Sequence, residues 1–519
     1  MSPLGTRLVF RLPHLMRALL IFAVVSATNT FSAPGEFDSS FAQGGIVRLS
    51  GDASLPADGQ ATSVSVDGAG KLYVTGVNNQ TRTGVMARLT SSGALDATFS
   101  GTGFILRARG TSESTRDALR AFPLANGNAL LIEGVAGFCF GSPGGCSISG
   151  IFDSQHGVSK ILADGSIDST YRNGASLGYS DTSITLASDG SLTAMSARQQ
   201  MVGRHFILRR YDTNGQPDPL FNETAVAAAI NCGPAYTEPT SSLSGAAPLK
   251  MRTAIQGNNR LLVVQQLRHY ITNSNDICIT RLNPDGSRDL TFGSSGQTII
   301  SDAGLTNHFP FKILVRANGS INLLLLNAPP KSIHRPALVW LGANGAIDTA
   351  QGSQGVVNPL IVPGMASITD VALQADDKLL LVGYGAPPGV PQAADLALPR
   401  ISRLGIRGEI DFGFGPFRSG NADLFSGTTR FAPNEITVSP NGNIYLAGAA
   451  GDSNPNNPTV IAVARLQGDI APIAPPPSSG GGGGGGCGYT QGEPFDPTLL
   501  AIMLFALWCL FARRRQLLH

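Results

Sequence analysis

One short pattern, Gly-x-x-Asp-x-x-Phe, recurs along the 519-residue chain and constrains its fold more than any other feature. The Gly and Asp recur in seven copies, and six copies keep an aromatic residue in the last place. Successive aspartates lie 50 to 72 residues apart, which indicates stacked copies of one supersecondary unit. The repeated pairs are Gly35 and Asp38, Gly93 and Asp96, Gly165 and Asp168, Gly215 and Asp218, Gly286 and Asp289, Gly345 and Asp348, and Gly408 and Asp411.

Between the copies lie runs of alternating apolar residues that meet at Asx-Gly turns, such as 61–66 and 72–76 around Asp67-Gly68. This alternation around an Asx-Gly pair predicts a β-hairpin. A third run, such as 85–89, precedes each motif, and a short fourth run, such as 104–106, follows it. Four short strands in each of seven repeats predict an all-β fold, a seven-bladed β-propeller of four-stranded blades over residues 34–470.

The two ends of the repeat array are offset by half a repeat. The first motif, at Asp38, has no strands before it, and the last strands, within 436–466, have no motif after them. We therefore expect an N-terminal strand near 46–49 to complete the blade that begins near Glu435. Such a closure removes the exposed strand edges that a ring would otherwise have.

The N-terminus has the features of a secretory signal peptide, predicted over residues 1–33. Arg7, Arg11 and Arg17 precede the apolar run 18–25, and cleavage after either Ala27 or Ala33 fits the small residues that follow. The sequence therefore predicts export across the inner membrane to the cell envelope or cell surface.

The C-terminus consists of a Pro/Ser/Gly-rich spacer, residues 471–488, and a sorting or transmembrane segment, residues 489–519. The spacer composition is typical of a flexible linker. The apolar run 499–512 ends at Arg513, Arg514 and Arg515, which predicts a short transmembrane helix with its arginines on the cytoplasmic side. We expect the protein to be anchored in the membrane at least transiently.

This tail resembles the JDVT-CTERM sorting signal of bacterial proteins, on the basis of Cys487, Asp496-Pro497-Thr498, the apolar run and the arginine cluster. The resemblance implies an intramembrane processing protease as a partner and places Cys487 near the processing or attachment point. Pro497 departs from the named motif. An ordinary single-pass anchor is the alternative.

The repeats resemble the delta-60 repeat of bacterial exported proteins. The fullest copy is Asp285-Gly286-Ser287-Arg288-Asp289-Leu290-Thr291-Phe292-Gly293, with Arg288 where that family has Leu. The resemblance implies a propeller-like fold and a surface location, and it implies no particular activity.

The repeated residues themselves suit structural roles. The Gly suits a left-handed turn position, the Asp suits accepting backbone N–H groups in the next turn, and the aromatic suits packing between blades. A calcium loop at 285–289 would lack its remaining oxygen ligands. The Gly-x-Ser-x-Gly string at 174–178 has no strand-to-helix context for a nucleophile. We expect no catalytic residue, no metal and no cofactor.

The charge balance bears on possible binding partners, and the cysteines bear on possible disulfides. With 37 basic and 35 acidic residues the chain has no basic footprint for nucleic acid. An oxidising compartment permits the candidate disulfides Cys139–Cys146 and Cys232–Cys278, although the sequence leaves their connectivity open.

These observations predict a non-enzymatic surface propeller that binds a protein or glycan ligand through its loops, or serves a structural role. The long inserts at 138–156 and 222–248 are the candidate binding loops. The alternative is an enzyme, a lyase or hydrolase, with its site in the central channel. Charged side chains converging in that channel would favour the enzyme, and an apolar lining would favour the binder.

Overall fold

The computed structural model describes residues 33–42, 44–49, 55, 58–108, 115–136, 155–172, 175–179, 183–200, 203–221, 223–233, 236–237, 251–269, 275–301, 303–305, 308–327, 336–362, 364–385, 398–452 and 459–469. The chain divides into two units, Met1–Ile470 and Ala471–His519, and all described residues belong to the first unit. Among the described helices, none has the length and apolarity required to cross a bilayer.

Several sequence predictions fall outside the described residues. These are the signal peptide up to residue 32, the candidate disulfide Cys139–Cys146, and the whole C-terminal tail with Cys487, Asp496, Pro497, Thr498, Arg513, Arg514 and Arg515.

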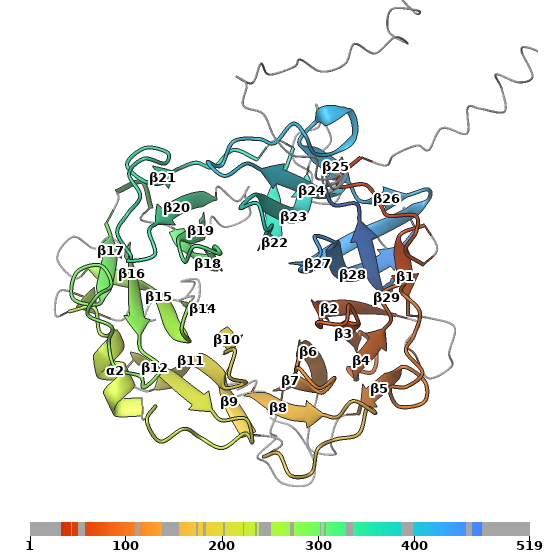
Figure 1. Ribbon diagram of the computed structural model, residues 1–519, viewed down its shortest axis with the longest axis horizontal. Coiled ribbons are helices and arrows are strands. Elements are labelled where there is room, and N and C mark those ends of the chain that lie inside the picture. Colours follow the sequence, from red (N-terminus) through yellow and green to blue (C-terminus); the bar gives the residue numbers. More distant parts are fainter. Residues whose placement is uncertain are drawn as a thin grey trace, which may run out of the picture. The chain divides into compact units, whose positions relative to one another are not determined.

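The described strands form seven antiparallel sheets, which stand as blades around a ring (Figure 1). This arrangement confirms the predicted all-β, seven-bladed propeller. Blade 1 comprises β2 (Gly59–Val66), β3 (Leu72–Asn78), β4 (Gly84–Leu89) and β5 (Phe104–Arg107). Blade 2 comprises β6 (Thr115–Pro123), β7 (Ala129–Ala136), β8 (Gln155–Ile161) and β9 (Ala175–Tyr179). Blade 3 comprises β10 (Ser183–Leu186), β11 (Leu192–Gln200) and β12 (Gly203–Tyr211).

The remaining four blades are antiparallel as well. Blade 4 comprises β14 (Met251–Gln256), β15 (Arg260–His269), β16 (Asn275–Leu282) and β17 (Gln297–Ile300), with β13 (Tyr236–Thr237) also paired to β15. Blade 5 comprises β18 (His308–Val315), β19 (Ile321–Asn327), β20 (Ala337–Leu341) and β21 (Val356–Val357). Blade 6 comprises β22 (Ser367–Leu373), β23 (Leu379–Gly385), β24 (Leu398–Leu404) and β25 (Asn421–Asp423). Blade 7 comprises β26 (Phe425–Ser426), β27 (Thr429–Val438), β28 (Ile444–Gly451), β29 (Val460–Leu466) and β1 (Ile46–Arg48). Two short 3-10 helices, η1 (Ala303–Leu305) and η3 (Pro416–Arg418), lie in loops.

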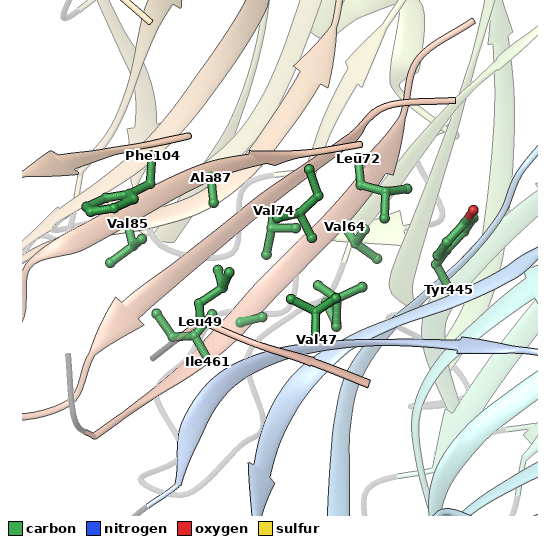
Figure 2. Close-up of a cluster of buried hydrophobic side chains, with 14 of the residues drawn as sticks. Val47, Leu49, Val64, Leu72, Val74, Val85, Ala87, Phe104, Tyr445 and Ile461 are labelled. Carbon is green, nitrogen blue, oxygen red and sulfur yellow. The ribbon is translucent and has the colours of Figure 1, made fainter. Parts of the chain in front are cut away.

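The ring closes through β1, which pairs with β29 so that Ile46 lies opposite Ala464. The N-terminal strand therefore becomes the outer strand of the last blade. Next to it, Val47 and Leu49 join a buried cluster with Val64 and Leu72 of blade 1 and Ile461 of blade 7 (Figure 2). This seam is as well packed as the interior of a blade, with most members under one-tenth exposed.

In the second strand of a blade, apolar and polar residues alternate less than in a strand that has one face exposed to solvent. In β19, Leu323, Leu324 and Leu325 are all buried, because the strand has a partner on either edge and a neighbouring blade on either face. Continuous apolar runs of this kind are typical of fully buried strands.

Blade 3 departs from the prediction of four strands, since it has three strands in the described part of the chain. The following insert instead contains the helix α2 (Glu223–Ile230), which contacts β12 at the outer edge of the blade (Figure 1). Its sequence, ETAVAAAI, contains four alanines, the residue with the highest helix propensity. Val226 and Ile230 bury the helix against Met251 of blade 4.

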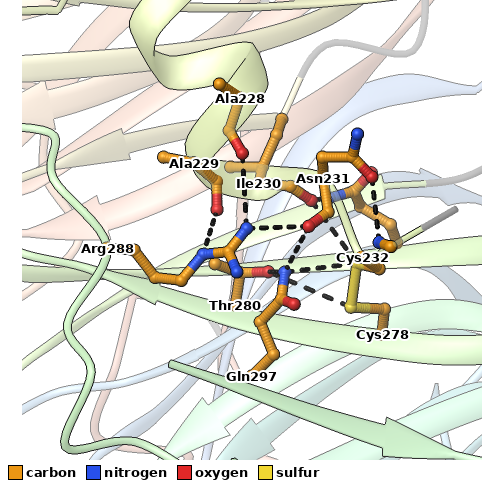
Figure 3. The surroundings of a disulfide bond; sticks show 11 residues. Ala228, Ala229, Ile230, Asn231, Cys232, Cys278, Thr280, Arg288 and Gln297 are labelled. Carbon is orange, nitrogen blue, oxygen red and sulfur yellow. Dashed lines mark hydrogen bonds between the residues drawn. A yellow bond between two sulfur atoms is a disulfide. The ribbon is translucent and has the colours of Figure 1, made fainter. Parts of the chain in front are cut away.

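A disulfide joins this insert to blade 4 (Figure 3). Cys232, two residues after α2, is bonded to Cys278 on β16. Arg288 supports the same segment, because its Nε donates to the carbonyl oxygen of Ala229 at 2.6 Å and its Nη2 donates to that of Asn231 at 2.7 Å. Residues 229–232 are thus held against blade 4.

Candidate functional site

The seven motif aspartates occupy equivalent turns after the third strand of a blade. In every copy the Oδ1 atom accepts the backbone N–H of the residue two positions later, at 2.8 to 3.2 Å. In four copies the Ser or Thr hydroxyl at that position donates to the same oxygen. The carboxylate therefore acts as a turn-forming acceptor.

The second carboxylate oxygen binds a basic side chain that the sequence analysis missed. In six copies a Lys or Arg at the end of the third strand contacts Oδ2. In five of them this cation lies eight residues before the Asp. The pairs are Arg88–Asp96, Lys160–Asp168, Arg210–Asp218, Arg281–Asp289, Arg403–Asp411 and, across the ring closure, Arg465–Asp38. Aligning the copies on their aspartates would have revealed this position.

The same cations lie over the motif aromatics. The charged group sits 4.1 to 5.9 Å from the ring centroid in all six copies, as for Arg281 over Phe292 at 4.7 Å. A cation at this distance is attracted to the face of the ring. Asp, cation and aromatic thus form one unit per blade.

The copy at Asp348 lacks both other members of the unit. Trp340 stands where the other copies have a cation, and Gln351 stands where they have an aromatic. Trp340 is almost fully buried, and its Nε1 donates to the carbonyl oxygen of Ile406 in the next blade at 3.2 Å. A large aromatic side chain here fills the space between blades 5 and 6.

The motif glycines combine a left-handed backbone with a close approach to the preceding blade. Their φ angles run from 78° for Gly215 to 93° for Gly35. A Cβ atom on Gly345 would lie 2.5 Å from the ring of Phe292, and one on Gly215 would lie 2.7 Å from that of Tyr171. Five of the seven glycines therefore serve as the surface on which the preceding motif aromatic packs, whereas Gly165 faces Ser100 and Gly408 faces Leu360 and Trp340.

The environments of Asp96 and Asp168 keep these two carboxylates ionised. Burial alone would raise the pKa of Asp96, but hydrogen bonds from Lys71 and Thr98 together with the Arg88 charge outweigh it and hold the pKa well below its usual range. Hydrogen bonds from Thr170 and Lys160 lower the pKa of Asp168 to about 2. The motif therefore stabilises the blades and offers no proton for transfer near neutral pH.

The innermost strands of all seven blades line a central channel of about 670 Å³ (Figure 1). Its wall carries three basic residues, Arg120, Arg252 and Lys312, and two acidic residues, Asp370 and Glu435. Hydroxyl and amide side chains make up much of the remainder, namely Thr62, Ser63, Ser183, Thr185, Thr253, Thr369 and Asn434. Eight apolar side chains complete the wall, namely Leu119, Phe122, Ile184, Leu186, Ala254, Ile255, Phe311 and Ile313, so the channel combines charged, polar and apolar surface.

Recurrent β-bulges shape this wall. The pairing register slips by one residue in five of the inner strands, between 61 and 63, 118 and 120, 310 and 312, 368 and 370, and 433 and 435. The residues immediately after the slips are Ser63, Arg120, Lys312, Asp370 and Glu435, and all of them line the channel. A bulge redirects side chains locally and is common next to active sites.

The two channel carboxylates are held in fixed positions. Asp370 Oδ1 accepts a hydrogen bond from Lys312 Nζ at 2.6 Å. Asp370 Oδ2 accepts one from the backbone N–H of Ile436 at 3.1 Å. Glu435 Oε1 lies 3.1 Å from Arg120 Nη2. Glu435 Oε2 accepts a hydrogen bond from the backbone N–H of Val64 at 3.1 Å. Each carboxylate therefore links two blades.

Three polar atoms of the channel wall make no hydrogen bond within the described part of the chain. They are Ser63 Oγ, Arg120 Nε and Thr185 Oγ1. Ser63 is 2% exposed, so its hydroxyl is shielded from bulk solvent. Unpaired buried polar groups are uncommon in proteins, so each calls for a physical explanation, such as a bound water or ion or a catalytic role.

The remaining sequence candidates lie apart from the channel. Ser176 of the Gly-x-Ser-x-Gly string lies on β9, opposite Gly157 of β8. His156 lies in β8 and His308 in β18, and neither lines the channel. Asp285 accepts the Ser287 backbone N–H and hydroxyl. No group of three or more metal-binding side chains occurs among the described residues. The channel residues were not predicted, because they do not repeat between blades.

Comparison with known proteins agrees with the fold. A family model described as a domain of unknown function (DUF5122) β-propeller matches residues 70–99 and 256–292, and each window contains one Asp motif. No curated protein matches the chain.

Several solved propellers are similar in structure. A polysaccharide lyase of the ulvan lyase family PL25, bound to -[GlcA(1-4)Rha3S]-, shares 8% identity with a TM-score of 0.42, over 84% of this chain and 95% of that one. The polysaccharide lyase Uly1 shares 10% identity with a TM-score of 0.44, over 85% and 98%. An α-L-arabinofuranosidase from Fusarium graminearum shares 8% identity with a TM-score of 0.37, over 69% and 94%.

These similarities correct the expectation that the protein is not an enzyme, because the solved propellers that it resembles include enzymes. At 8–10% identity the likeness concerns the fold alone and assigns no reaction. The channel wall carries five charged side chains, the feature expected of an enzyme, beside eight apolar ones, the feature expected of a binder.

Proposed function

We propose that the protein is a glycan-cleaving enzyme, a lyase or a hydrolase, whose reaction site is the central channel. The observation that carries this proposal is the convergence of Arg120, Lys312, Asp370 and Glu435 at bulge positions of the inner strands. The same four residues also form the inter-blade ion pairs Arg120–Glu435 and Lys312–Asp370, which fix the carboxylates in the channel wall.

The channel contains the groups that both reactions require. A carboxyl group can transfer a proton, and a nearby cation can stabilise the negative charge that develops in the transition state. Hydrolysis adds water across the glycosidic bond and uses carboxyl groups on either side of it. Elimination removes a proton beside a sugar carboxylate, breaks the adjacent C–O bond and leaves a double bond, while the departing oxygen gains a proton. We assign Glu435 and Asp370 as the proton-transfer candidates.

The remaining lining suits a polyhydroxylated ligand. Ser183 and Thr253 share a hydrogen bond of 2.9 Å, and Thr185 keeps an unpaired hydroxyl. Hydroxyl and amide groups both donate and accept hydrogen bonds, so they match sugar hydroxyls in either direction.

The test is incubation of the purified protein with a panel of acidic and neutral polysaccharides. Unsaturated products, which absorb in the ultraviolet, identify a lyase, and new reducing ends without such absorption identify a hydrolase. Glu435→Gln should lower the rate by about 10²- to 10⁴-fold. Glu409→Gln, an exposed carboxylate outside the channel, should leave it unchanged. Failure to cleave any member of the panel overturns the proposal.

The cellular setting is part of the same proposal. The N-terminal signal peptide, the delta-60-like repeats and the JDVT-CTERM-like tail support an exported enzyme held at the cell envelope, with an intramembrane protease as its processing partner. Intact-mass measurement on envelope protein should show the tail missing beyond about Cys487. A full-length tail in that measurement would leave only a simple membrane anchor.

A further inference from the structure

Ser63 lies at the post-bulge position of blade 1, between the equivalent residues of its two neighbours. Arg120 holds that position in blade 2, and Glu435 holds it in blade 7. The Arg120 side chain reaches across blade 1, so that its Nη2 atom lies 3.1 Å from Glu435 Oε1. A guanidinium and a carboxylate therefore meet across blade 1, whose Ser63 lines the same channel.

This sector has hydrogen-bond donors to spare. Arg120 Nε and Ser63 Oγ make no hydrogen bond within the described residues. The guanidinium also lies over the ring of Phe122 at 5.1 Å, which restrains the side chain. The Arg120 side chain nonetheless keeps 41% exposure, so it can turn towards a ligand without unpacking its strand.

The chemistry of these donors favours an anionic oxygen group. A hydrogen bond between a guanidinium and an anionic oxygen is roughly twice as strong as one between neutral groups. The wall as a whole has three cations, Arg120, Arg252 and Lys312, against two carboxylates, Asp370 and Glu435. Arg120 and Lys312 are paired with Glu435 and Asp370, so the surplus positive charge of the wall is that of Arg252. A ligand anion at Arg120 therefore shares the guanidinium with Glu435.

We infer that Arg120 and Ser63 form a subsite for an anionic substituent, a carboxylate or a sulfate ester, and that this subsite selects acidic over neutral glycans. The inference rests on the proposed function and narrows its substrate class. Glu435 acts here as a positioning residue, because it holds one edge of the guanidinium and leaves Nε for the ligand.

The test is equilibrium binding to the full-length protein, measured calorimetrically. Three oligosaccharides of equal length serve as probes: an oligouronate, its carboxyl-reduced neutral counterpart and a sulfated oligosaccharide. The preferred acidic probe should bind about ten- to a hundredfold more tightly than the neutral one, as expected for a gained hydrogen bond to a charged group. The two acidic probes distinguish a carboxylate from a sulfate.

Variants identify the subsite. Arg120→Gln should abolish the preference for acidic probes, Arg120→Lys should retain part of it, and Ser63→Ala should weaken acidic binding several-fold. Arg82→Gln is the matched control, because Arg82 has the same 41% side-chain exposure and pairs with an inner-strand carboxylate, Asp117, but does not line the channel. Unchanged unfolding temperatures show that the variants fold.

The outcomes separate this inference from the proposed function. Equal binding of acidic and neutral probes, no binding of any probe, or an Arg120→Gln variant that keeps the preference, overturns the subsite. Selective acidic binding without cleavage supports the subsite and contradicts the enzyme. Cleavage of acidic and neutral glycans at equal rates supports the enzyme and contradicts the subsite.

Discussion

Arg465 Nε lies 2.7 Å from Asp38 Oδ2, although the two residues are separated by 427 positions in the sequence. In the five other copies that have a cation, the cation and the Asp belong to one continuous blade. The first Asp motif of the chain therefore completes the last blade, together with β1. The pair ties the two ends of the repeat array to each other.

Deletion of residues 34–50 should destabilise the whole ring, because it removes β1, Asp38 and the apolar contacts of Val47 and Leu49. It also leaves β29 with an unpaired edge, which favours association between molecules. We expect a lower unfolding temperature and dimers or aggregates in size-exclusion chromatography. A chain lacking only residues 2–32 is the control. If the longer deletion unfolds at the control temperature, β1 does not close the ring.

The contribution of the cation–Asp pair can be measured by comparing Asp289, which pairs with a cation, with Asp348, which has Trp340 in place of the cation. Asp289 is 4% exposed and paired with Arg281, so Asp289→Asn leaves a buried guanidinium without its counter-charge and should cost about 3–5 kcal/mol. Asp348 lies beside Trp340 instead of a cation, so Asp348→Asn should cost less than about 1 kcal/mol. Urea unfolding of the two variants measures the difference. Equal costs would show that the cation contributes little.

Gly345→Ala should be strongly destabilising for two physical reasons. The residue has φ of 82°, and the added Cβ would lie 2.5 Å from the ring of Phe292. Left-handed strain and overpacking together predict a cost of about 2–5 kcal/mol. Gly68→Ala is the control, because a Cβ there meets nothing within 4 Å. Thermal unfolding compares the variants, and matching temperatures would contradict the packing argument.

Acid should weaken the motif at Asp168 in a defined range of pH. The folded pKa of Asp168 is about 2, below the value of about 3.9 for an unfolded chain. The ionised carboxylate therefore stabilises the fold above about pH 4, and this contribution is lost as the pH falls towards 2. The difference in unfolding temperature between the wild type and Asp168→Asn should shrink over that range. A difference that stays constant down to about pH 2 would rule out this titration.

The architecture was predictable because the Asp motif repeats. Seven copies of Gly and Asp reinforce one another, so that a substitution such as Gln351 for the aromatic does not hide the count. The cation of each unit was also present in the sequence, eight residues before each aspartate from Asp96 to Asp411 except Asp348, but it required alignment of the copies. The helix α2 was missed because it occurs once, in an insert with no counterpart in other blades.

The channel could not be predicted in the same way. Arg120, Lys312, Asp370 and Glu435 come from different repeats, and their positions depend on bulges that leave no mark in the alternation of apolar residues. The pair Arg120–Glu435 joins residues 315 positions apart, from blades that are not neighbours. Only the closed ring brings such residues together.

The residues that follow the bulges differ between blades, whereas the residues of the Asp motif hardly differ. The residue after the bulge is Ser, Arg, Lys, Asp or Glu according to the blade, whereas the Asp motif is nearly uniform. The second strand of each blade lies between the two positions. The inner positions can therefore differ from blade to blade without a change in the Asp motif. A new ligand preference can evolve on this scaffold by exchange of single inner residues, without rebuilding the ring.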